Sequence, residues 1–173
     1  MFRVVSIRSE DYPEHITRST HDVTAAPFVT AVKDGYRIDL DTLEEGRTLL
    51  ICNETREVMT KISFDNGAIT ILNNDERCIH IQAKKPIKKL HFDSAATCIF
   101  DDGIDVDFIN LHAKRIESAN GFKVNQAANI LAETLTTNQQ CYLGKETHIT
   151  VNDWTLERGC KVQQSQFQNL CIR

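Results

Sequence analysis

The sequence lacks any long run of apolar residues. No stretch approaches the ~18 consecutive apolar residues that a membrane-spanning helix needs. Residues 1–8 contain no sustained apolar segment and no small-residue cleavage site, so they do not indicate a secretory signal. We therefore expect a cytoplasmic protein, or an extracellular one if the chain is a fragment of a longer exported protein.

Proline and glycine are also scarce, and no paired cysteine motif is present. The 173 residues include 3 prolines and 7 glycines, fewer than is typical of a disulfide-stapled secreted domain. The 6 cysteines form no C-x-x-C pair, which argues against a zinc knuckle or a thioredoxin-like site. We accordingly expect free thiols, no metal and no cofactor. A net charge of −4 argues against a nucleic-acid partner, because such binding needs a basic surface.

What the chain does contain is an apolar repeat of about 19 residues. The columns of the repeat are Phe92, Leu111, Ile130 and Ile149; Cys98, Ile116, Leu135 and Trp154; and Ile104, Phe122, Cys141 and Cys160. Within each repeat the apolar residues alternate with polar ones, which is the pattern of strands. A parallel β-helix explains both features, because each coil stacks on the previous one at about 4.8 Å and its inward residues form columns. The alternative is an antiparallel β-sandwich, which predicts alternation but no columns kept in phase.

The repeat also suggests how the chain is organised. We expect an all-β fold with a parallel β-solenoid over residues 58–173, most regular over 87–163, and a β-rich N-terminal cap or arm over 1–57. Asn66-Gly67 lies between two alternating segments, which is a strong hairpin signal. That hairpin either caps the solenoid or forms a corner of its first coil.

Two outward ladders follow from the same spacing. Asp105, Lys123, Tyr142 and Lys161 form an outward stripe, which we take as the most plausible flat binding face. His91, Asn110, Asn129 and His148 immediately precede an inward column and are expected to form a stacked structural ladder rather than a metal site.

The acidic run at 101–107 offers the alternative of a carbohydrate-active enzyme. Asp105 and Asp107 flank an inward valine, so their carboxyl groups lie about 7 Å apart along a strand, a separation compatible with acid–base catalysis. Asp102, Asp105 and Asp107 would then be the catalytic residues. A basic run precedes them by one coil, so an ion-paired, solvated face explains the same residues without catalysis.

Residues 87–163, with segments such as Ile109 to Val124, resemble the β-helix repeats of filamentous-haemagglutinin-type proteins. The size and repeat length are also similar to bactofilins, which are cytoplasmic polymer-forming solenoids. The first resemblance implies adhesion or surface display, and the second implies self-assembly; neither supplies a catalytic motif. We favour a non-enzymatic binding or scaffolding module whose flat faces meet a partner protein or other copies of the chain. A secreted adhesin fragment is a further alternative, and carbohydrate a further candidate ligand.

Overall fold

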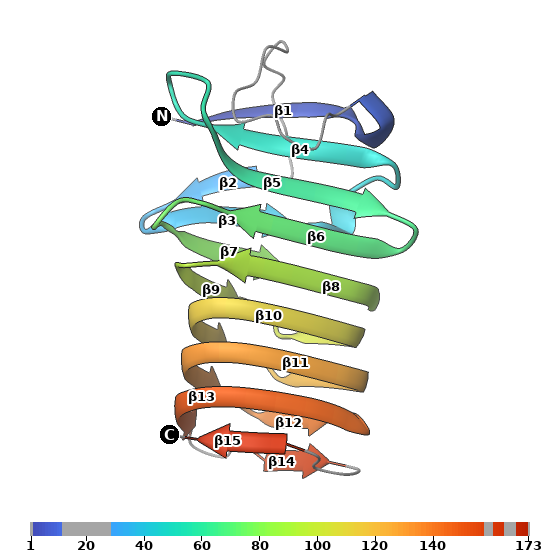
Figure 1. Cartoon of the computed structure of the whole chain (residues 1–173), viewed down its shortest axis with the longest axis vertical. Coiled ribbons are helices and arrows are strands. Elements are labelled where there is room, and N and C mark those ends of the chain that lie inside the picture. The colour runs from blue at the N-terminus through green and yellow to red at the C-terminus, as the bar shows by residue number, and fades with distance from the viewer. Residues whose placement is uncertain (1, 12–28, 158–160, 165–168, 173) are drawn as a thin grey trace.

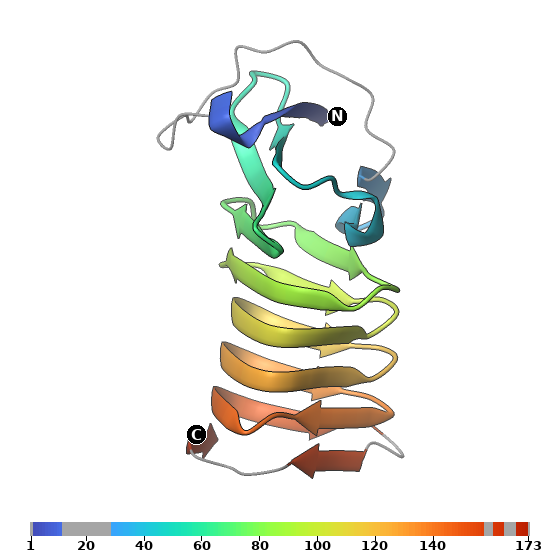
Figure 2. The ribbon, with the colours of Figure 1, turned by 90° about the vertical axis from the view of Figure 1, so that its right-hand side faces the viewer.

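A computed structural model describes residues 2–11, 29–157, 161–164 and 169–172. Strands dominate it, and most of them stack in parallel coils of about 19 residues (Figures 1 and 2). The stack makes about five turns. The predicted parallel β-solenoid is therefore confirmed, and the antiparallel sandwich is not the fold of this chain.

The strands are β1 (Arg3–Arg8), β2 (Val29–Val32), β3 (Gly35–Asp39), β4 (Arg47–Cys52), β5 (Val58–Asp65), β6 (Ala68–Asn73), β7 (Cys78–Gln82), β8 (Ile87–Ser94), β9 (Thr97–Phe100), β10 (Ile104–Ser118), β11 (Phe122–Thr137), β12 (Gln140–Leu143), β13 (Glu146–Leu156), β14 (Lys161–Gln164) and β15 (Asn169–Ile172). Two short 3-10 turns, Ser9–Asp11 and Leu40–Thr42, complete the described structure. No helix in the described ranges has the length and hydropathy to cross a membrane.

The apolar columns predicted from the sequence lie in register. Leu111 pairs with Phe92 on one side and with Ile130 on the other, and Ile130 pairs with Ile149. All of these side chains are buried, and Leu170 continues the backbone register below Ile149. The period arises because one coil of chain is needed to bring each apolar side chain back above its predecessor.

A second inward column lies in register on the other side of the coil. Ile116 pairs with Cys98 and with Leu135, and Leu135 pairs with Trp154. The indole of Trp154 packs against the core, and its Nε1 donates a hydrogen bond to Thr137 Oγ1 at 3.0 Å. The residue thus belongs to the core column, as the sequence indicated.

The N-terminal end of the stack is closed by antiparallel strands. β1 pairs with β4, β4 with β5, and β5 with β6, all antiparallel, whereas β6 pairs with β8 in parallel. The turn at Asn66-Gly67, with both residues at positive φ, joins β5 to β6. The hairpin therefore lies at the top of the solenoid (Figure 1), and β6 begins the parallel coils on this side.

The other side of the top coil is reached by β3. It forms an antiparallel hairpin with β2 and pairs in parallel with β7, which in turn pairs with β9. The chain leaves β3, builds the antiparallel layer of β4 and β5, and returns through β6 to β7. Residues 29–57 therefore contribute both to the cap and to the first parallel ladder.

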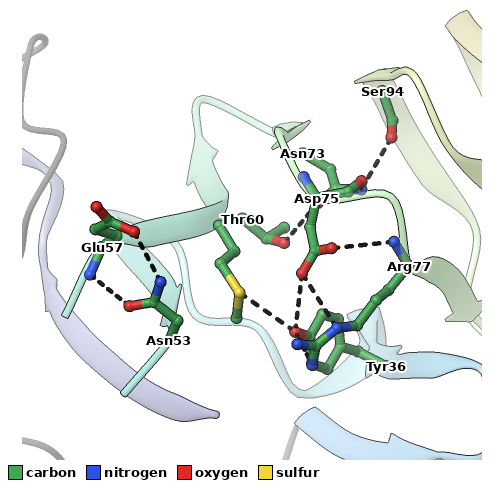
Figure 3. A network of polar contacts seen from close by, with 9 residues as sticks. Tyr36, Asn53, Glu57, Thr60, Asn73, Asp75, Arg77 and Ser94 are labelled. Carbon is green, nitrogen blue, oxygen red and sulfur yellow. Dashed lines mark hydrogen bonds and ion pairs between the residues drawn. The ribbon is translucent and has the colours of Figure 1, made fainter. Parts of the chain in front are cut away.

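A polar network joins the cap to the first coil (Figure 3). Asn73 is buried, and its side chain accepts hydrogen bonds from Thr60 Oγ1 and the Asp75 N–H and donates to Ser94 Oγ and the Asp75 carbonyl, all at 2.9–3.1 Å. Nearby, the Tyr36 hydroxyl lies 3.3 Å from Asp75 Oδ2 and 2.9 Å from an Arg77 nitrogen. These contacts fix β3, β5, β6 and β8 relative to one another.

Candidate functional site

Two adjoining hollows on the surface of the solenoid each cross successive coils, and together we call them the groove. These adjoining segments, of about 510 and 800 Å³, share Ala95, Lys114 and Glu133. Residues of successive coils line the groove, because it follows the corner where β10, β11 and β13 bend. At this corner Lys114 and Arg115 are both exposed, which breaks the strict alternation of buried and exposed side chains.

The lining of the groove comes from equivalent positions of successive coils, which carry different side chains. In the register of the strands, His112 pairs with Leu131, which pairs with Thr150, and Arg115 pairs with Thr134. Leu131, a large apolar side chain, has 47% of its surface exposed in the groove. The groove thus offers charges of both signs, hydroxyl groups and an apolar contact at intervals of about 4.8 Å.

The predicted stripe is present in part. Asp105 pairs with Lys123 and Lys123 with Tyr142, and the Lys123 ammonium lies 3.9 Å from an Asp105 carboxylate oxygen. The register does not continue to Lys161, because Tyr142 pairs with Gln163 and Lys161 with Gln140. The predicted position of Lys161 is therefore wrong: this coil is longer than 19 residues. Val162 rather than Cys160 pairs with Cys141, and Cys160 lies outside the described residues.

The three aspartates of the enzymatic alternative lie in one coil but do not form one open site. Asn125, from the next coil, places its side-chain nitrogen 2.9 Å from Asp105 Oδ1 and 3.1 Å from Asp107 Oδ1. Asp102 is exposed in the turn between β9 and β10. One amide group therefore clasps two of the carboxylates, which gives them a structural partner.

The predicted ladder of amide and imidazole groups lies in register. Asn110 pairs with His91 and with Asn129, and Asn129 pairs with His148. The ladder covers one outer face of the solenoid, beside the inward column that begins with Phe92. Its position agrees with a structural role, because identical side chains in adjacent parallel strands lie one above the other.

Sequence reasoning missed a cluster around His80. Cys78 and His80 project from the same face of β7, and Asp34 reaches them from the turn between β2 and β3. His80 Nε2 lies 2.9 Å from Asp34 Oδ1, and His80 Nδ1 lies 2.8 Å from Asp101 Oδ1. Arg37 Nε donates to the other oxygen of Asp101 at 2.8 Å. The spacing Cys-x-His on a strand was the one available signal, since residues i and i+2 share a face.

The protonation of this cluster follows from its contacts. Burial by itself lowers the pKa of His80, but the hydrogen bonds and negative charges of Asp101 and Asp34 outweigh it and raise that pKa above its usual value. Burial, together with the charge of Asp34, raises the pKa of the Cys78 thiol to about 12. The thiol lies within 4.8 Å of a carboxylate oxygen of Asp34, and both nitrogens of His80 face carboxylates. Both ring nitrogens of His80 are thus engaged by carboxylates, and a thiol with a raised pKa is a poor nucleophile.

The architecture and these surfaces define a β-solenoid protein with an antiparallel cap. No protein-family model matches the chain, and neither the curated proteins nor the solved structures contain a match to it.

Proposed function

We propose that the protein is a non-enzymatic binding module that holds an extended segment of a partner protein in the groove along its axis. The observation that carries this proposal is the continuity of the groove across successive coils, whose strands are locked in register. A surface built on such a stack is preorganised, so binding does not require ordering of the receptor.

The chemistry of the groove favours a polypeptide. Lys114 and Arg115 supply positive charge, Glu133 and Glu76 supply negative charge, and Leu131 offers an apolar contact. A strongly acidic polymer would be repelled by the glutamates, whereas an extended peptide of mixed sequence can satisfy both signs and bury an apolar side chain.

The polar groups that resemble catalytic residues support the same conclusion. Asp105 and Asp107 are bridged by Asn125, and the imidazole of His80 is held between Asp34 and Asp101. In each case the group that would have to move a proton is engaged by another side chain of the same chain. This arrangement suits a scaffold better than it suits acid–base catalysis.

The test uses a photo-crosslinking amino acid at position 131 in the full chain expressed in its own cells. Leu72 is the matched control, because it is also a partly exposed leucine of the solenoid but lies outside the groove segments that contain Leu131. We expect adducts with a particular protein from position 131 only, and Glu133→Lys in the same chain should reduce their yield at least tenfold.

Two results would contradict the proposal. Adducts of equal yield from positions 131 and 72 would show that the groove has no selectivity. Adducts only with other copies of this chain, together with a concentration-dependent mass in light scattering, would show that the surface mediates self-assembly instead.

A further inference from the structure

The side chains of Asp34, Cys78 and His80 converge on one another. One potential ligand atom of each residue lies within 4.8 Å of the other two. The three residues offer a sulfur, a nitrogen and a carboxylate oxygen. This donor set is typical of zinc and chemically similar divalent ions, and it is poorly suited to magnesium or calcium, which prefer oxygen ligands.

The surroundings of His80 resemble the outer shell of a metal site. A histidine that binds a metal through one ring nitrogen commonly donates its other N–H to a carboxylate, which fixes the orientation of the ring. His80 Nδ1 makes this contact with Asp101 at 2.8 Å, and Arg37 holds Asp101 from the other side. His80 Nε2, which faces Asp34 and Cys78, is then the nitrogen that can bind an ion.

The distances are compatible with an ion after small movements. Zinc bonds of about 2.0–2.3 Å in tetrahedral geometry place ligand atoms about 3.3–3.7 Å apart. The Nε2 atom of His80 and the Oδ1 atom of Asp34 are 2.9 Å apart, so they would separate by only a few tenths of an ångström. The side chain of Asp34 is 55% exposed, which gives an ion a route from solvent, whereas Cys78 is buried.

The charge balance also permits an ion. In the structure His80 Nε2 lies 2.9 Å from the carboxylate of Asp34, and the Cys78 sulfur lies within 4.8 Å of a carboxylate oxygen of Asp34. A divalent cation is bound by a thiolate and a neutral imidazole, so its binding releases protons from these groups and their loss offsets part of its charge. Asp101 and Arg37 keep their ion pair throughout, at 2.8 Å.

We propose that Asp34, Cys78 and His80 bind one divalent transition-metal ion of the zinc type, with Asp101 as the positioning residue of His80. Three protein ligands leave the fourth tetrahedral position for water or for a group of another molecule. The expectation of no metal was based on the lack of paired cysteines in the sequence, whereas the ligands here come from separate segments of the chain.

The test is a titration of the full, reduced and chelator-treated chain with Co²⁺ as a spectroscopic probe, followed by displacement with Zn²⁺. We expect one equivalent of Co²⁺ to produce a thiolate-to-cobalt charge-transfer band and tetrahedral visible bands, and Zn²⁺ to raise the unfolding temperature. Cys78→Ser should abolish the charge-transfer band. Asp101→Asn should retain it but weaken Co²⁺ binding by about 10- to 100-fold.

His112→Ala is the matched control, because His112 also contacts an aspartate, Asp93, at 3.1 Å but has no cysteine in that contact. It should leave the Co²⁺ titration unchanged. Asp34→Ala changes an exposed turn residue and is expected to fold, so it tests the third ligand even if variants of the buried Cys78 do not fold. The proposal is overturned if the wild-type chain gives no band at one equivalent, or if the band persists unchanged in Asp34→Ala and Cys78→Ser.

Discussion

Gly35 lies so close to Cys78 that a β-carbon on Gly35 would stand 1.8 Å from the carbonyl oxygen of Cys78. The two residues are partners in the parallel ladder between β3 and β7. The absence of a side chain at position 35 is therefore what lets β3 approach the first coil and bring Asp34 to Cys78.

Gly35→Ala should consequently lower the free energy of unfolding by about 3 kcal/mol or more, because only backbone movement can relieve the contact. Gly46→Ala is the control. Gly46 has a φ of +78°, but a β-carbon added to it would meet nothing within 4 Å, so its substitution should cost about 1 kcal/mol through backbone strain alone. Urea unfolding followed by circular dichroism measures both, and equal losses would refute the role of the close approach.

A comparison of Asn73 with Asn53 measures how burial changes the stabilisation that a hydrogen-bonded asparagine provides. Each side chain takes part in four hydrogen bonds, but those of Asn73 are buried or partly buried and those of Asn53 are exposed to solvent. Figure 3 shows both residues. Asn73→Ala leaves buried polar groups without partners, so it should destabilise the fold by about 2–4 kcal/mol, whereas Asn53→Ala should cost about 1 kcal/mol. Chemical denaturation tests this difference, and a larger loss from Asn53→Ala would contradict it.

Tyr36 should make stability depend on alkaline pH. Burial, and after it the charge of Asp75, raises the pKa of Tyr36 from 10.0 to about 12. The folded chain therefore holds the phenolic proton more tightly than the unfolded chain. The resulting stabilisation, about 3 kcal/mol, is fully present below pH 10 and is lost as pH rises through 12.

Tyr36→Phe should lose less stability than the wild type at alkaline pH, because only the contributions of other groups remain. Denaturant unfolding of both chains between about pH 9 and 12 provides the comparison. Ultraviolet titration provides a second readout: one of the 3 tyrosines should ionise late in the wild type, and that component should vanish in the variant. Identical alkaline profiles of the two chains would show that Tyr36 is not protected in this way.

The clasp of Asn125 over two carboxylates predicts a specific double-mutant behaviour. Asn125→Ala removes the shared donor of Asp105 and Asp107 and leaves their charges to repel, so it should destabilise the chain by about 1 kcal/mol. Adding Asp107→Asn to that variant removes the repulsion and should recover part of the lost stability. A thermodynamic cycle measures the coupling; strictly additive effects would show that the three groups do not act together.

The sequence predicted the solenoid because its columns follow from one period. Phe92, Leu111 and Ile130 can all be buried only if each coil returns the chain to the same place. Where the coil length changes, the prediction fails, as it did for Lys161. The cap had a local signal only at Asn66-Gly67, so its pairing with the first coil could not be inferred from the repeat.

The cluster around His80 could not be predicted from the repeat, because its residues are far apart in the sequence. His80 is 46 residues from Asp34 and 21 from Asp101, and neither aspartate belongs to a motif with it. The return of the chain from the antiparallel layer to β7 creates their proximity. Only the pair Cys78 and His80, two positions apart on one strand, was visible in the sequence.

The pairing of β10 with β11 has a consequence for how such a molecule can change its length. The two strands match almost residue for residue over their whole extent, with a single irregularity between Val106 and Phe108. A tandem copy of residues 108–126, inserted after residue 126, would keep the 19-residue register with the coils above and below it. The groove would grow by about 4.8 Å with each added coil while the cap stayed intact. Gene duplication can thus change the length of this molecule in uniform steps of one coil.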